Sequence, residues 1–170
     1  ELMIIDTQGA RSVLLEAAVL ACDLALSPVT PETLAARELH RGTLQLLQDV
    51  APFRQWGIEP PVLRLLLNRV PAVSASARLI QQVLRQMYQE EPGVSVLATD
   101  SPAIEAYPRA AALGWPVHRV EPRRPSGRIA PAALETVRAL ACELLPQWRA
   151  QFEQVSGKSI AANRRSDARG

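Results

Sequence analysis

An aspartate and a glycine near the start of the chain are the first residues whose types and spacing could do chemistry. In the run ELMIIDTQG, Asp6 directly follows the apolar residues Leu2 to Ile5, which predict a buried strand, and Gly9 comes shortly after. A carboxylate at the end of a buried strand is costly to ionise unless it meets a cation or hydrogen-bond donors. Magnesium can be that cation, usually through a water, and a glycine lets a backbone N–H approach a phosphate. These residues predict a magnesium and phosphate site, with a helix cap by Asp6 as an equal alternative.

Alternating strands and helices must position such a site. Apolar runs predict strands at residues 2–5, 24–29, 62–67 and 94–98, and WPVHRV predicts a fifth short edge strand. Helix-forming segments predict helices at about residues 10–22, 31–50, 74–91, 103–113 and 131–152. Thr30 is the expected cap of the second helix, with Pro31 at its first position, and Ser74 or Ser76 is expected to cap the third. Residues after Ser156 are expected to form a mobile tail.

Polar residues follow four of the predicted strands. Strands that alternate with helices pair in parallel through right-handed crossovers, and ligands bind at the carboxyl ends of such strands. Four polar sets are therefore expected at one edge of the sheet: Asp6–Gly9, Ser27–Glu32, Asn68–Arg69 and Thr99–Pro102. By its position alone, Asn68 fits a turn residue at a strand end.

The composition fits a globular α/β protein. Among 170 residues, 48% are hydrophobic and 21% charged, which excludes a disordered or fibrous chain, and only 4% are aromatic. Cys22 and Cys142, far apart in apolar helical contexts, are predicted to be buried reduced thiols, which favours the cytoplasm. No apolar run approaches the length of about 20 residues that a bilayer requires, so no membrane association is expected. The net charge of +2 does not by itself indicate nucleic-acid binding.

The order of these motifs resembles the C-terminal part of the ParA/MinD family of partition ATPases, from Leu2 to about Leu145. The most specific match is CDLALSPVTPETLA in its place after IIDTQG, and LLLNRV and EAYPRAAALGWPV follow. The resemblance implies a parallel sheet flanked by helices, in a P-loop NTPase fold of the SIMIBI type that is incomplete at the N-terminus. Residues 1–152 would belong to the ATPase domain and residues 153–170 would form a flexible basic tail.

The resemblance also implies roles for single residues, with ATP and Mg²⁺ as cofactors. Asp6, at the end of the Walker B strand, would order the magnesium ion, and Gly9 would lie in the switch that touches the γ-phosphate. Asn68 would bind the adenine edge, with Arg69 beside it in the nucleotide-binding set. Two further residues, Pro31 and Glu32, would lie near the nucleotide and the dimer interface.

The chain departs from the family in one important way. The glycine-rich loop that holds the phosphates is expected on a strand before the Walker B strand, and G-x-x-x-x-G-K-[ST] does not occur in these 170 residues. Gly157-Lys158-Ser159 is a chance tripeptide, because Phe152 stands where the first glycine is needed. Without a central strand we expect unpaired edges, exposed apolar faces and no catalytic competence of this chain alone. The natural protein is therefore expected to be longer.

Members of the family typically bind DNA nonspecifically as ATP-dependent dimers and respond to a ParB-like stimulating partner. Arg78 and Arg85, seven residues apart on one helix face, and Arg109 are the candidate DNA contacts, although a solvated face explains them equally well. The proline-rich loop supplies a weaker patch, namely Arg123, Arg124 and Arg128. The function expected is a cytoplasmic, nucleoid-associated partitioning ATPase for a plasmid, integrative element or chromosome. The alternatives are a noncatalytic remnant or partner-binding module, and a biosynthetic ATP-dependent ligase of the same superfamily.

Overall fold

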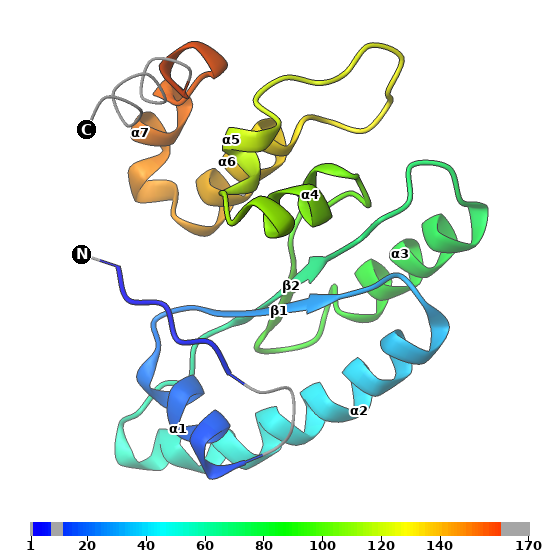
Figure 1. Ribbon diagram of the computed structural model, residues 1–170. Coiled ribbons are helices and arrows are strands. Elements are labelled where there is room, and N and C mark those ends of the chain that lie inside the picture. Colours follow the sequence, from blue (N-terminus) through cyan, green and yellow to red (C-terminus); the bar gives the residue numbers. More distant parts are fainter. Residues whose placement is uncertain (1, 8–11, 161–170) are drawn as a thin grey trace. The chain divides into compact units, whose positions relative to one another are not determined.

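The computed structural model describes residues 2–7 and 12–160, apart from the side chains of Thr43 and Leu44 (Figure 1). Strands alternate with helices along the first part of the chain, and helices alone follow. The elements are, in chain order, α1 (Val13–Ala21), β1 (Ala25–Val29), α2 (Thr33–Val50), η1 (Ala51–Trp56), β2 (Leu63–Leu67), α3 (Ala75–Met87), β3 (Val94–Val96), α4 (Ala106–Leu113), α5 (Val117–Val120), α6 (Ala133–Leu144), η2 (Pro146–Trp148) and α7 (Arg149–Gln154).

The chain divides into two compact units. The first unit comprises Glu1–Leu66 and Ser76–Val96, and it contains α1, α2, α3 and most of the sheet. The second unit comprises Leu67–Ala75 and Leu97–Gly170, and it contains α4 to α7. The last residue of β2 thus opens the second unit, so the segments that follow β2 and β3 belong to the same unit.

The sheet has three parallel strands in the order β1-β2-β3. Strands β2 and β3 pair in parallel with Leu63 opposite Val94 and Leu65 opposite Val96. Most of β2 is buried, which is typical of a strand covered on both faces by helices. The α/β class, the parallel pairing and the flanking helices agree with the sequence prediction, since each apolar run was followed by a helical crossover.

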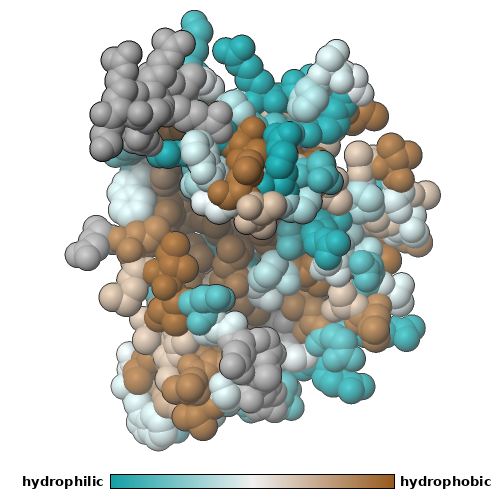
Figure 2. Space-filling model, in the orientation of Figure 1, coloured by the Kyte–Doolittle hydropathy of each residue, from teal (hydrophilic) through white to brown (hydrophobic). Residues whose placement is uncertain are grey.

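The predicted first strand is wrong. Residues 2–7 form no strand among the described residues, and Leu2, Met3, Ile4 and Ile5 are 55%, 86%, 83% and 51% exposed. Figure 2 shows this hydrophobic surface beside the N-terminal end. A strand is stabilised by a hydrogen-bonded neighbour and by burial of one face, and an apolar sequence alone provides neither.

Helices α1 and α2 lie against each other (Figure 1). Ser12 caps α1, because its hydroxyl oxygen accepts the N–H of Leu15 at 3.2 Å. The predicted cap of α2 is wrong by two residues: the cap position is Glu32, whose backbone is extended, and Thr30 instead closes a three-residue turn in which its carbonyl accepts the N–H of Glu32. The helical conformation can begin only after that turn.

Two predicted elements end early. Helix α3 begins after Ser74, as predicted, but ends at Met87. Strand β3 ends at Val96, where we expected it to continue to Ala98. The N–H of Ala98 is donated to a carboxylate on α6. A backbone donor used in this way is lost to a strand ladder.

Helix α4 ends as predicted, whereas the predicted fifth strand is wrong. Gly114 stops α4 with a left-handed conformation at φ 63°. The WPVHRV segment that follows forms the short helix α5. Its two valines are three residues apart, which suits one face of a helical turn, and the carbonyl of Pro116 accepts the N–H groups of Arg119 and Val120.

The predicted long closing helix is interrupted at Pro146. Leu145 leaves the helical region, with φ −129° and ψ 64°, because a proline disfavours the helical conformation in the residue before it and has no N–H to donate. After α7, residues 157–160 form a helical turn whose Ser159 N–H is accepted by the Ser156 hydroxyl, and Ile160 is buried. The tripeptide Gly157 to Ser159, which has the Gly-Lys-Ser sequence found in phosphate loops, is thus the start of a helical turn capped by Ser156.

A buried ion pair closes the proline-rich loop between α5 and α6. Glu121 is 7% exposed, and both of its oxygens accept hydrogen bonds from the guanidinium of Arg128, one of them at 2.7 Å. The same carboxylate accepts the N–H of Ala133 in the first turn of α6, and Arg128 also donates to the carbonyls of Ala130 and Pro131. The pair fixes both ends of the loop and caps α6.

Both cysteines are free thiols, as predicted. Cys142 is buried, but Cys22 is only half-buried, and burial raises the pKa of the Cys22 thiol. Among the described residues, no helix combines the length and the apolar character that crossing a bilayer requires.

Breaking the loop-closing pair is predicted to destabilise the protein in a pH-dependent way. The Arg128 guanidinium holds the pKa of Glu121 below its ordinary value of 4.5, so the pair stabilises the fold above that pH and the contribution is lost as the pH falls. Glu121→Gln should lower the free energy of unfolding by about 3 kcal/mol at neutral pH, measured by urea denaturation. The difference from the unchanged protein should shrink below about pH 4.5.

Glu59→Gln is the matched control, because its 3.1 Å pair with Arg54 is largely exposed. A Glu121→Gln protein as stable at neutral pH as Glu59→Gln would contradict the role given to the buried pair.

Candidate functional site

The segments that follow β2 and β3 lie side by side in the second unit. The N–H of Ser101 donates to the carbonyl of Leu67 at 2.8 Å, and the N–H of Val70 donates to the carbonyl of Ser101 at 2.9 Å. The N–H of Ala103 then donates to the carbonyl of Val70, and Val70 and Pro102 form a parallel bridge. Asn68–Arg69 and Thr99–Pro102 are therefore brought together, as predicted from the carboxyl ends of parallel strands.

Arg69 has a strained backbone at this edge. Its φ of 54° lies in the left-handed region, where a non-glycine residue costs about 1–2 kcal/mol. The side-chain oxygen of Asn68 accepts the N–H of Arg69 at 3.0 Å and so helps to hold the turn. Asn68 is half-buried and Arg69 exposed. Strain of this kind is concentrated at ligand sites and switches, which supports a functional interpretation of the edge.

The second strand end has a rigid base. Ser101 is 5% exposed, and its hydroxyl lies 3.3 Å from the hydroxyl of Tyr107 in α4. Pro102 is buried as well. Thr99 and Asp100 are half-buried, so their side chains can be reached from solvent. The arrangement presents polar side chains on a backbone that the neighbouring segment and α4 hold in place.

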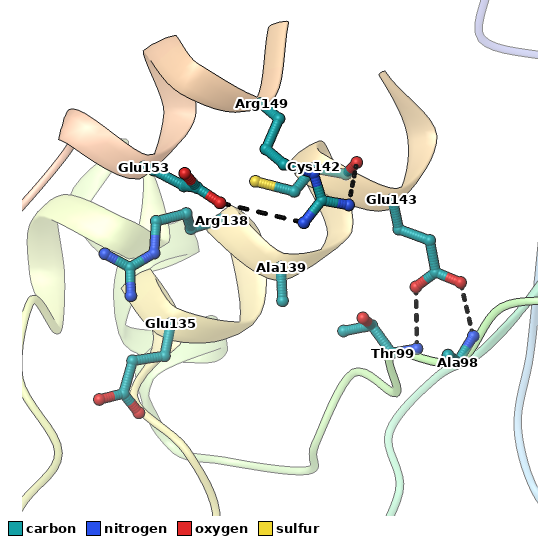
Figure 3. Close-up of a pocket in the computed structure, with 9 residues that line it drawn as sticks. All are labelled: Ala98, Thr99, Glu135, Arg138, Ala139, Cys142, Glu143, Arg149 and Glu153. Atoms are coloured by element: carbon teal, nitrogen blue, oxygen red, sulfur yellow. Dashed lines mark hydrogen bonds and ion pairs between the residues drawn. The ribbon is translucent and has the colours of Figure 1, made fainter. Parts of the chain in front are cut away.

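Glu143 of α6 holds the start of this segment. One carboxylate oxygen accepts the N–H of Ala98 at 2.6 Å and the other accepts the N–H of Thr99 at 3.0 Å (Figure 3). Sequence analysis did not identify Glu143, because its partners lie more than forty positions away. The available signal was the position of Glu143 inside the apolar run ALACELL. A carboxylate that is partly buried must find hydrogen-bond partners.

A hollow of about 670 Å³ opens beside this contact. Its walls come from α6, α7 and the strand end (Figure 3), and they include Ala98, Thr99, Glu135, Arg138, Ala139, Cys142, Glu143, Arg149 and Glu153. Arg138 donates to the carbonyl of Val155 at 3.3 Å, and Arg149 donates to the carbonyl of Cys142 at 3.5 Å and lies 3.9 Å from Glu153. Both arginines thus border the hollow that contains Glu143.

Other residues predicted for the nucleotide site belong to the first unit. Asp6 is exposed, Pro31 is buried and Glu32 is exposed at the cap of α2. Gly9 lies outside the described residues. The structure therefore brings together the Asn68 and Thr99 sets, which share a unit, and describes Asp6, Pro31 and Glu32 separately from them.

Asp6 could hold a magnesium ion only if phosphate oxygens of a ligand supplied further metal ligands. Within residues 2–7 and 12–160, no three His, Cys, Asp or Glu side chains are grouped so that they could hold a metal ion. Magnesium is usually bound by one or two carboxylates, several waters and the phosphates of the substrate. Asp6 alone fits that pattern only in the presence of a bound nucleotide.

The arginines predicted to contact DNA differ in their availability. Arg78 is exposed on α3 and Arg85 is half-buried. Arg109 is exposed and donates to the carbonyl of Val120 at 3.3 Å. In the proline-rich loop Arg123 and Arg124 are exposed, but the inclusion of Arg128 in that patch is wrong, because Glu121 and two carbonyls occupy its guanidinium.

Comparison with known proteins adds no assignment. The sequence matches no family model, and no curated protein is significantly similar to it. What the chain does must therefore be argued from the residues and their geometry.

Proposed function

We propose that this chain contributes the nucleotide-base edge and the Walker B segment of a partition-type ATPase of the ParA/MinD kind. The observation that carries the proposal is the pairing of the Asn68–Arg69 turn with the Thr99–Pro102 segment at the carboxyl ends of parallel strands. Ligands of open α/β sheets bind at this edge. Asn68 supplies the donor and acceptor groups that an adenine edge requires.

The N-terminal segment supports the same proposal. The family arrangement would put the strand of the glycine-rich loop beside the Walker B strand, in the middle of the sheet. Among the described residues β1 is an outer strand paired only with β2, and Leu2 to Ile5 are exposed and outside any strand. These features are what would remain of such a sheet without the loop strand, whose motif does not occur in these 170 residues.

In the proposed enzyme Asp6 would hold a magnesium ion through water, and the chemistry that such an ion supplies is neutralisation of phosphate charge. Asn68 orients the adenine, and Gly9 allows the switch backbone to approach the γ-phosphate. Pro31 and Glu32, in the turn before α2, would lie near the nucleotide and the dimer interface. Asp6 and Gly9 would act on phosphate only in the presence of the glycine-rich loop, which holds the phosphates.

The nucleotide state of the proposed ATPase controls homodimer formation and nonspecific DNA binding, and a ParB-like protein stimulates hydrolysis. Arg78 and Arg85 on α3 are the preferred phosphate contacts, with Arg109 as a further one. Arg123 and Arg124 form the alternative surface, since Arg128 is excluded by its pair with Glu121. The proposed location is the nucleoid within the cytoplasm.

The proposal predicts a phosphate loop upstream and a magnesium role for Asp6. The coding sequence before Glu1 should contain K-G-G-x-G-K-[ST] within roughly one hundred residues.

In the protein that contains this loop, Asp6→Ala should lower the rate of ATP hydrolysis by about 100-fold, because the metal is no longer positioned. Asp23→Ala is the control, since Asp23 is an exposed carboxylate of the same unit and should leave the rate unchanged.

Equal hydrolysis by Asp6→Ala and Asp23→Ala would refute the magnesium assignment. An intact reading frame without the loop would favour the noncatalytic alternative, a remnant or partner-binding module.

A further inference from the structure

We propose that the N–H groups of Ala98 and Thr99, together with Arg149, form a binding site for a small carboxylate or phosphate anion, and that Glu143 fills this site as an internal ligand. The proposal concerns the hollow beside α6. It shares Thr99 with the nucleotide-base edge proposed above, but it rests on the N–H groups of Ala98 and Thr99 and not on Asn68.

The two backbone donors define the site. Consecutive N–H groups, from Ala98 and Thr99, converge on one carboxylate, and each meets a different oxygen at 2.6 and 3.0 Å. Successive backbone N–H groups that converge in this way favour anions, and hydrogen bonds to a charged acceptor are about twice as strong as neutral ones. The carboxylate of Glu143 thus marks where an external carboxylate or phosphate would bind.

Two guanidinium groups add positive charge to the same hollow. Arg138 and Arg149 each carry five N–H donors, and their described contacts are long ones to the carbonyls of Val155 and Cys142 and to Glu153. Both side chains line the hollow that contains Glu143, and Figure 3 shows the guanidinium of Arg149 toward its middle and that of Arg138 pointing away from Glu143. Of the two arginines, Arg149 is therefore the better placed to meet an anion that the backbone donors hold.

The remaining acidic groups leave room for an anion. Glu135 is committed to the start of α6, because its carboxylate accepts the N–H of Ala132 at 2.9 Å. Glu153 lies 3.9 Å from Arg149. Solvent reaches the donors, since Ala98 is exposed and Thr99 and Glu143 are half-buried. A volume of about 670 Å³ is ample for a small anion.

Chemical rescue tests the proposal. Glu143→Ala removes the internal ligand and should lower the melting temperature of the chain by about 5 °C or more, because two charge-assisted hydrogen bonds are lost. Sodium acetate or inorganic phosphate should then restore much of the loss relative to sodium chloride at equal ionic strength. Rescue by acetate alone identifies a carboxylate site, and rescue by phosphate identifies a phosphate site.

Glu153→Ala is the matched control, because Glu153 lines the same hollow but accepts neither N–H group. Acetate and phosphate should give Glu153→Ala and the unchanged protein only the smaller, general stabilisation over chloride that excluded anions give any folded chain. A destabilised Glu143→Ala protein that neither anion rescues would overturn the proposal and leave Glu143 as a purely structural contact.

A second variant covers failure of Glu143→Ala to fold. Glu143→Gln keeps the size of the side chain but faces one of the two donors with an NH₂ group, so the site is weakened. In this variant titration with acetate or phosphate should shift the amide resonances of Ala98 and Thr99 with saturation. Absence of such shifts, or equal shifts with chloride, would overturn the proposal.

Discussion

The candidate site depends on the parallel hydrogen bonds that join the segment after β2 to the segment after β3. Leu67, Val70, Ser101 and Ala103 supply these bonds, at 2.8 to 2.9 Å. They extend the pairing of the sheet past the ends of the strands. The turn of Asn68 and Arg69, in which Arg69 has a left-handed backbone, thereby lies beside the segment that contains Thr99 and Asp100. These bonds are what hold the two polar sets side by side.

Long-range polar contacts hold the start of the segment after β3 and the loop before α6, which the backbone pairing does not reach. Glu143 anchors the start of the second segment from α6, and Glu121 with Arg128 fixes the loop that leads into the same helix. Both carboxylates accept backbone N–H groups at the ends of elements, where donors have no partner within their own helix or strand. Helix α6 is thereby tied at its first turn to the loop and near its last turn to the strand end. This double attachment explains how a site on irregular segments can be rigid.

The sequence predicts much of this fold because its strongest signals are local. The apolar runs of β1 and β2, the helix between them and the stop at Gly114 follow from residue type and spacing. The wrong or missing predictions concern features that depend on contacts between distant residues, or segments in which two local signals compete. Leu2 to Ile5 have the composition of a strand, but composition cannot supply a neighbour to pair with. The V-x-x-V spacing of α5 fits a helical turn as well as a strand, and Pro146 outweighed the helical pattern around it. The contacts of Glu143 join residues far apart in sequence, so no single-sequence pattern could locate them.

The edge formed by the segments after β2 and β3 is proposed to bind a nucleotide base, and titration of the isotopically labelled chain with adenosine measures this binding. Adenosine carries no phosphate, so its binding does not require the glycine-rich loop. We expect saturable NMR shifts of the Asn68 side-chain amide and of the backbone amides of Arg69, Thr99 and Ser101, and we expect the backbone shifts to be lost in Asn68→Ala. Shifts confined to other parts of the chain, or no shifts at millimolar adenosine, would contradict it.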